Sequence, residues 1–131
     1  MRIVYLLICW LFIAVSAWAE DEEAPQKPVI EYLEMAPKFT VNLDGPRKYL
    51  MINVQLMVEG QDHLEKIKKH LPALRHELIM LFSGRKSADL GTMEQRESLR
   101  QESIDAVRKT LEKYADSDGF RDLFFTEFLV H

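Results

Sequence analysis

The chain has 131 residues and a formal net charge of −4 at neutral pH, with 17 Lys and Arg against 21 Asp and Glu. This length suits one domain, and the acidic balance argues against nucleic-acid binding, which requires a basic surface. The only cysteine, Cys9, lies in the apolar N-terminal segment. The folded part therefore has no cysteine for a disulfide or a thiolate metal site, and burial of apolar side chains has to stabilise it.

Residues 1–19 have the pattern of a secretory signal peptide or of a membrane anchor. An uncharged run follows Arg2 and ends at residues 17–19 (AWA), the small-x-small pattern of a signal-peptidase site. A helical run of about 16 residues rises about 24 Å, less than the ~30 Å hydrocarbon layer, which favours the signal peptide over an uncleaved anchor. Both interpretations place the remainder outside the cytoplasm. The charged, proline-containing residues 20–29 predict a flexible linker before a folded domain at residues 30–131.

Two segments of alternating polarity predict an antiparallel hairpin. The first covers residues 30–35 and then 39–43, alternates most clearly over residues 39–43 and indicates a half-buried strand. The turn residues 44–46 (DGP) follow it. Residues 49–58 are the strongest strand pattern in the chain, because every second residue is a branched aliphatic one. The short turn between the two segments predicts that they pair.

A helical pattern begins after Gly60. Asp62 and Glu65 have the spacing of a capping box. One apolar stripe then continues at alternating spacings of three and four through Leu64, Ile67, Leu71, Leu74, Leu78 and Leu81. Pro72 falls inside the stripe, so we expect a kink or two short helices that share one face. Residues 83–84 (SG) predict the end of this region.

A second capping box, formed by Thr92 and Gln95, predicts a helix that continues to Tyr114. Its expected buried edge consists of Leu99, Ile104, Val107, Leu111 and Tyr114. Residues 116–119 (DSDG) end this helix, and residues 123–130 are rich in phenylalanine and predict a final strand. We expect this strand to pair with the central one.

The predicted order of elements is strand, strand, helix, helix, strand. It indicates an α+β domain in which two or three helices cover one face of a small antiparallel sheet. The other face carries Tyr49, Met51 and Met57 among polar neighbours and is therefore amphipathic. This face and the basic turn at Arg47 and Lys48 are the candidate interaction surface.

No pattern in the chain predicts catalysis, a cofactor or a metal. The spacings between His63, His70 and His76 are seven and six, whereas two metal ligands on one helical turn are three or four apart. The acidic runs at residues 20–23 and 116–118 lack the apolar flanks that raise the pKa of a catalytic carboxyl. Phosphate-binding glycine loops and nucleophile elbows are also missing from the sequence. We therefore expect a protein that is not an enzyme.

Three passages together resemble the FliL family of flagellar proteins. They are YLEMAPKFTVNL at residues 32–43, LRHELIMLFSGR with the later LGTMEQRESLR at residues 74–100, and FFTEFLVH at the end. The residues that match the family motifs are Phe39, Asn42, Leu43, Leu74, Arg75, Leu99, Arg100, Phe125, Thr126 and Phe128. Two departures are the short N-terminal apolar run without a basic cytoplasmic stretch, and His131 in place of a final glutamine. The first departure suggests a signal-peptide-bearing, soluble paralogue.

The resemblance implies a flagellar basal-body protein with a stomatin-like periplasmic domain, on the periplasmic side of the inner membrane. It further implies association with MotA/MotB-type stator proteins, a homo-oligomeric ring, and support of torque, swimming, swarming and chemotaxis. The alternative from the residues themselves is a general periplasmic peptide- or lipid-binding module unrelated to the flagellum. An apolar pocket larger than about 300 Å³ would favour this alternative.

Overall fold

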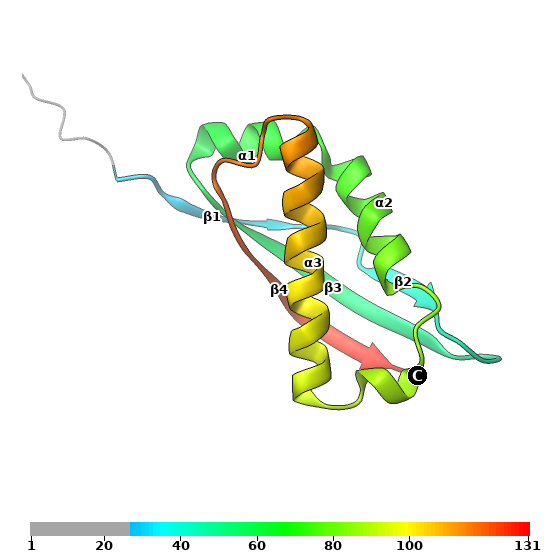
Figure 1. Ribbon diagram of the computed structural model, residues 1–131. Coiled ribbons are helices and arrows are strands. Elements are labelled where there is room, and N and C mark those ends of the chain that lie inside the picture. Colours follow the sequence, from blue (N-terminus) through cyan, green and yellow to red (C-terminus); the bar gives the residue numbers. More distant parts are fainter. Residues whose placement is uncertain (1–26) are drawn as a thin grey trace, which may run out of the picture.

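The computed structural model describes residues 27–131 as a four-stranded antiparallel sheet with helices on one face (Figure 1). The strands are β1 (Ile30–Glu34), β2 (Phe39–Asn42), β3 (Tyr49–Glu59) and β4 (Phe120–Val130). The helices are α1 (Gln61–Lys68), α2 (Leu71–Phe82), the short 3-10 helix η1 (Ser87–Leu90) and α3 (Met93–Lys113). This confirms the predicted α+β class and the antiparallel sheet. The predicted signal or anchor segment, with Cys9, and most of the predicted linker lie outside the described residues.

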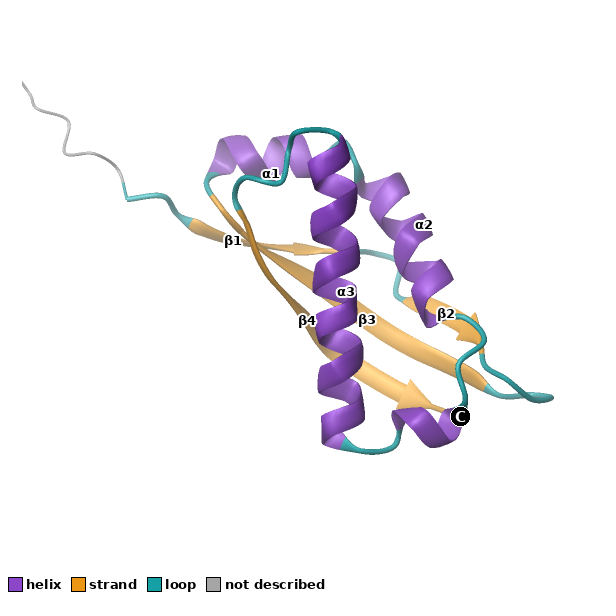
Figure 2. Ribbon diagram, viewed as in Figure 1, coloured by secondary structure: helices purple, strands orange, loops and turns teal. Residues whose placement is uncertain are grey.

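Strand β3 is the centre of the sheet. β1 and β2 lie end to end along one of its edges, and β4 runs along the other (Figure 2). The side chains that β3 turns toward the helices are fully buried: Leu50, Ile52, Val54, Leu56 and Val58. Their neighbours in register are also apolar, because Leu56 lies opposite both Leu33 of β1 and Leu123 of β4. The apolar residues of the predicted period-two pattern thus form the part of the core that the sheet contributes.

The first predicted strand is interrupted in the structure. β1 ends opposite Gln55 and β2 begins opposite Ile52, so residues 35–38 lie where β3 supplies only two residues. Pro37 in this segment has no backbone N–H to donate to a ladder. The segment leaves the sheet there, and pairing resumes at Phe39. The domain therefore has four strands where the sequence pattern predicted three.

Pro72 separates α1 from α2, as expected from the sequence. It occupies the first turn of α2, where a missing N–H costs no helical hydrogen bond. The two helices share a buried face made of Leu64, Ile67, Leu74, Leu78 and Phe82. The predicted capping box at Asp62 is wrong. Gly60 is the N-cap residue, with a φ of 94° that favours glycine, so Asp62 lies within the first turn and its carboxylate complements the helix dipole.

Helix α3 begins with the predicted capping box. Thr92 Oγ1 accepts a hydrogen bond from the backbone N–H of Gln95, and Gln95 Oε1 accepts one from the N–H of Thr92. The predicted burial of Tyr114 is wrong. Tyr114 is the C-cap residue, past the last turn that packs on α2, and its ring is exposed while it stacks on His70.

The last strand starts three residues earlier than predicted. Phe120 is buried opposite Val58, and the N–H of Glu59 donates to the carbonyl of Gly119 at 2.8 Å. Two shifts in register, one beside Asn53 and one beside Met57, show that β4 is bulged along its length. The predicted pairing of this strand with the central strand is confirmed.

Candidate interaction surfaces

The face of the sheet that points away from the helices is the larger candidate surface. We call it the outer sheet face and define it by Tyr32, Tyr49, Met51, Met57 and Leu129. Tyr49, Met51 and Met57 were predicted here and are half-buried on it. Tyr32 lies opposite Met57, and Leu129 lies opposite Met51. Tyr32 is 60% exposed, so this face presents apolar surface to solvent.

A polar band crosses the middle of the outer sheet face. Asn53 Nδ2 donates to Glu34 Oε1 at 3.0 Å, and Lys38 Nζ bonds Glu127 Oε2 at 2.8 Å. Asn53 Oδ1 is buried and has no hydrogen-bond partner among the described residues. The band divides the face into an apolar part around Met57 and another around Met51.

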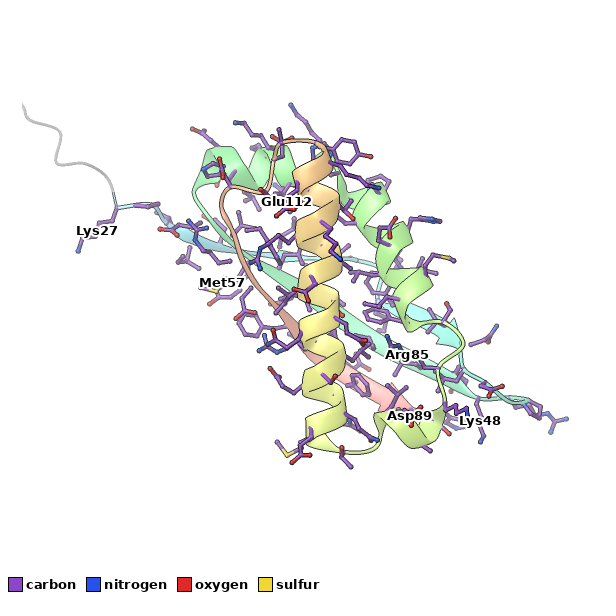
Figure 3. The ribbon with its side chains drawn as sticks, viewed as in Figure 1. Lys27, Lys48, Met57, Arg85, Asp89 and Glu112 are labelled. Carbon is purple, nitrogen blue, oxygen red and sulfur yellow. The ribbon has the colours of Figure 1, made fainter. Side chains whose placement is uncertain are left out.

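The basic turn at Arg47 and Lys48 forms the exposed tip of the hairpin between β2 and β3. Figure 3 shows Lys48 at the end of the molecule opposite Lys27. Tyr49, the next residue, stacks on the ring of His131 at 4.9 Å between centroids. Met57 is eight residues after Tyr49 along β3, a distance of about 26 Å. The structure therefore places the basic turn beside one end of the outer sheet face only.

Most of the residues that match the family motifs serve the fold. Four are buried in the core: Phe39, Leu43, Leu74 and Leu99. Two lie exposed on strands, Asn42 and Thr126. The remaining four are half-buried at the joins between helices and sheet: Arg75, Arg100, Phe125 and Phe128.

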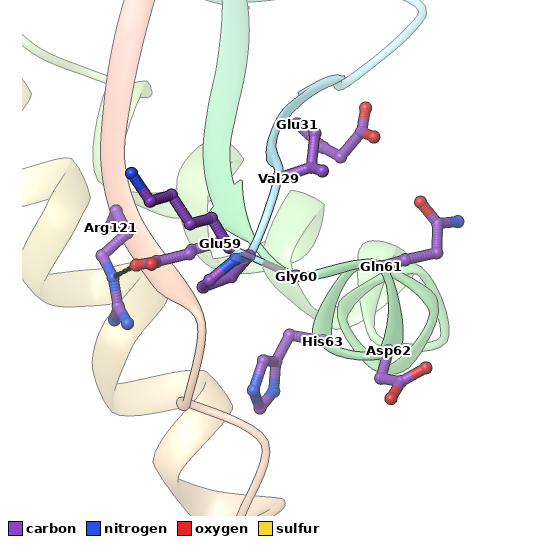
Figure 4. A pocket seen from close by; sticks show the side chains of 10 residues that line it. Val29, Glu31, Glu59, Gly60, Gln61, Asp62, His63 and Arg121 are labelled. Atoms are coloured by element: carbon purple, nitrogen blue, oxygen red, sulfur yellow. Dashed lines mark hydrogen bonds and ion pairs between the residues drawn. The ribbon is translucent and has the colours of Figure 1, made fainter. Parts of the chain in front are cut away.

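One hollow lies at the end where the described chain begins (Figure 4). It has a volume of about 580 Å³ and is open, with polar and apolar atoms in nearly equal shares of its lining. Its walls come from the start of β1, the start of α1 and the start of β4. Arg121 Nε bonds Glu59 Oε2 at 2.6 Å across it, and His63 lies close by. The charges of Arg121 and Glu59 thus satisfy each other.

A smaller, more apolar hollow lies between the first two turns of helix α3 and the second half of strand β4. We call it the α3–β4 groove; its volume is about 320 Å³, and it is lined by Met93, Arg96, Glu97, Arg100, Phe124, Phe125 and Phe128. The guanidinium carbon of Arg96 lies 4.5 Å from the centroid of the Phe128 ring, and that of Arg100 lies 5.7 Å from that of Phe124. Sequence reasoning missed this groove. The available signal was a pair of arginines four apart on a helix, together with three phenylalanines in the last strand.

Arg100 is held by its neighbours in the groove. It donates to both carboxylate oxygens of Glu97 at 2.7 and 2.9 Å and to Asp122 Oδ1 at 2.7 Å. These bonds from Arg100, helped by Gln101, lower the pKa of Glu97 from 4.5 to about 2. The same carboxylate raises the pKa of Arg100, so this ion pair is fixed at neutral pH.

Two further observations concern residues 27–131. No three His, Cys, Asp or Glu side chains in this part of the chain gather closely enough to hold a metal ion. Its helices are all too short or too polar to cross a membrane.

Comparison with known proteins places the domain in a family. Residues 32–130 match the family model described as flagellar basal body-associated protein FliL. The flagellar protein FliL of Aquifex aeolicus is 33% identical over 109 residues, which are 82% of this chain and 65% of that relative. The flagellar protein FliL of Escherichia coli K12 is 28% identical over 116 residues, or 86% of this chain and 73% of that relative. The chain thus spans slightly less than two thirds of the Aquifex protein. These matches confirm the resemblance found in the three sequence passages.

Proposed function

Because the chain belongs to the FliL family of flagellar basal body-associated proteins, we propose that it is a non-enzymatic accessory protein of the flagellar motor. In this proposal it lies on the periplasmic side of the inner membrane and associates with stator proteins of the MotA/MotB type. It supports motor torque and thereby swimming, swarming and chemotaxis. The observation that carries the proposal is the family match over residues 32–130, nearly the whole folded domain.

In this proposal, the outer sheet face contacts a second copy of the chain, so that several copies form a ring. Helices cover only the opposite face of the sheet, which leaves Tyr32 and Leu129 exposed. Each of them lies opposite a methionine of β3, Met57 for Tyr32 and Met51 for Leu129, and exposed apolar pairs of this kind favour association with another protein surface. The ion pair of Lys38 with Glu127 lies among them and would fix the orientation of the second copy.

In this proposal, the basic turn at Arg47 and Lys48 contacts the stator. Lys48 lies at the end of the domain opposite Lys27, and Arg47 precedes it in the same exposed turn. Two adjacent cations on an acidic protein would steer an acidic partner surface to that end.

The test is a deletion strain complemented with variants and scored for swimming at low and high viscosity. We expect the deletion to reduce speed most at high viscosity, because torque under load is the proposed role. Tyr32→Glu and Leu129→Glu place charges on the outer sheet face and should restore motility poorly. Met80→Glu is the matched control, since Met80 is 64% exposed on α2, away from the sheet.

Normal motility of the deletion strain at both viscosities would contradict the flagellar role. Crosslinking in cells separates the two contacts that are proposed. Charge reversal at Arg47 and Lys48 should remove crosslinks to the stator and keep those between copies, whereas Tyr32→Glu should do the opposite. The α3–β4 groove, more apolar and with a volume of about 320 Å³, reaches the size named for a general binding module. That alternative predicts wild-type motility for all of these variants, and the family match favours the flagellar role over it.

A further inference from the structure

We propose that the α3–β4 groove binds an extended peptide segment of a partner protein, one that carries a carboxylate and a bulky apolar side chain on the same side. The groove lies between α3 and the free edge of β4, and one of its lining residues, Phe124, also contacts Tyr32 of the outer sheet face, with 6.5 Å between the ring centroids. Peptide binding to the groove does not require the roles proposed for that face or for the basic turn. Three properties of the groove support it: an apolar hollow, an arginine with free donors, and an unpaired strand edge.

The hollow suits an apolar side chain. Phe124, Phe125 and Phe128 of β4 line it, and its volume of about 320 Å³ exceeds that of any single side chain. Met93 at the rim is 88% exposed, although methionine side chains gain free energy from burial. An apolar side chain in the groove would cover the phenyl rings and Met93 together.

Arg96 supplies the charge that the peptide has to match. Its Nε donates to the carbonyl of Leu90 at 3.2 Å, and its guanidinium stacks on Phe128. Its two terminal amino groups meet no carboxylate or other acceptor within residues 27–131. Arg100, one turn later, differs because Glu97 and Asp122 already occupy its donors. Arg96 therefore offers the paired donors that bind a carboxylate in a bidentate manner.

The edge of β4 supplies the backbone partner. β4 pairs with β3 along one side, and no strand within the described part of the chain pairs with its other side. An unpaired edge presents N–H and C=O groups to which an extended peptide can add as a strand. Arg100 Nη1 donates to the carbonyl of Leu123 at 3.0 Å and so caps one end of this edge. In an added strand, residues two apart point to the same side, which brings the carboxylate to Arg96 and the apolar side chain to the hollow.

The test is selection of a phage library of random twelve-residue peptides on the purified full chain. We expect an enriched consensus with Asp or Glu two residues from a bulky apolar residue. A synthetic peptide of that consensus should bind Arg96→Glu and Met93→Glu more weakly by about tenfold or more. Arg108→Glu is the matched control and should bind normally, because Arg108 also lies on α3 and over a phenyl ring, that of Phe120, outside the groove. Hydrogen exchange of the amides of residues 124–129 should slow in the complex.

The proposal is wrong if the consensus lacks an acid, if no consensus emerges, or if Arg96→Glu binds the peptide as tightly as the parent chain does. It is also wrong if the exchange at residues 124–129 stays unchanged. A full-chain dimer that dissociates on Arg96→Glu would make a second copy the occupant and would equally overturn it. Thermal unfolding of each variant checks its fold, and Met93→Glu provides a test on an exposed side chain if Arg96→Glu does not fold.

Discussion

Arg75 of α2 stacks on the ring of Phe39 of β2, with its guanidinium carbon 4.3 Å from the ring centroid. The same guanidinium donates to the carbonyl of Pro37 at 2.6 Å and to that of Lys38 at 3.4 Å. It therefore satisfies two carbonyls of the segment between β1 and β2, which leaves the β3 ladder. The contact joins the helical layer to the point where the sheet edge is interrupted.

We predict that Arg75→Lys lowers the free energy of unfolding by about 1 to 2 kcal/mol, although the charge is kept. A lysine has one nitrogen and cannot stack on Phe39 while it bonds both carbonyls. Urea unfolding followed by circular dichroism measures the change. Arg47→Lys, the same substitution at the exposed hairpin tip, should change stability by less than about 0.5 kcal/mol. Equal stability of the two variants would refute this role for Arg75.

The sequence predicted the features of the fold that depend on local patterns, but not contacts such as that of Arg75 with Phe39, which depend on tertiary packing. The burial of β3, the helix break at Pro72 and the cap at Thr92 follow from local rules of spacing and residue type, and these predictions are confirmed. The position of Arg75 on Phe39 depends on how α2 lies over β2, a packing that no local pattern contains. The interruption of the sheet edge after β1 was not predicted for the same reason.

The candidate surfaces depend on tertiary pairing even more than the Arg75 contact does. Tyr32 and Leu129 complete the outer sheet face because β1 and β4 pair with β3 in one particular register. They are almost one hundred residues apart in the chain, and a shift of register by one residue would turn either of them to the core side. The α3–β4 groove likewise combines side chains from two distant elements. Residue types and periods predicted what faces the core, whereas tertiary pairing decided which side chains meet outside it.

A second prediction concerns Gly119, which has a φ of 87°. A Cβ at this position would lie 2.4 Å from the Cβ of His63 and 2.9 Å from the carbonyl oxygen of Glu59. Gly119→Ala should therefore lower stability by about 2 to 4 kcal/mol, through backbone strain together with the displacement of α1. Gly91→Ala should be neutral or slightly stabilising, because Gly91 has a φ of −87° and open space around it. Thermal and urea unfolding of both variants give the comparison, and a stable Gly119→Ala protein would show that this close approach is absent.

A third prediction concerns His70, which joins the corner between α1 and α2 to the loop after α3. Its Nε2 lies 2.6 Å from Asp116 Oδ2, and its ring stacks on Tyr114 at 4.3 Å between centroids. Both side chains of this hydrogen-bonded pair are mostly buried. His70→Ala should lower the free energy of unfolding by about 1 to 3 kcal/mol, since it removes a hydrogen bond to a carboxylate and an aromatic contact.

A double-mutant cycle of His70→Ala with Asp116→Ala isolates the hydrogen bond from the stack. We expect a coupling energy of about 1 kcal/mol at neutral pH. His76→Ala, on the exposed side of α2, is the control and should change stability by less than about 0.5 kcal/mol. A coupling energy near zero would assign the effect of His70 to packing on Tyr114 alone.

A fourth prediction follows from the low pKa of Glu97, about 2 in the folded chain against an ordinary value of 4.5. Because the folded-state pKa lies below the unfolded one, the carboxylate stabilises the fold fully above about pH 4.5, and this contribution is lost as the pH falls toward 2. Glu97→Gln should thus be less stable than the parent chain at pH 7, by a small amount since Glu97 is exposed, and the difference should shrink between pH 4.5 and 2.

NMR titration of the Glu97 carboxyl carbon measures the midpoint directly. Arg100→Gln should move that midpoint up toward the ordinary value, and Gln101→Ala should move it less, because Arg100 donates two hydrogen bonds to Glu97 and Gln101 donates one. A midpoint that Arg100→Gln leaves unchanged would mean that another group holds the carboxylate.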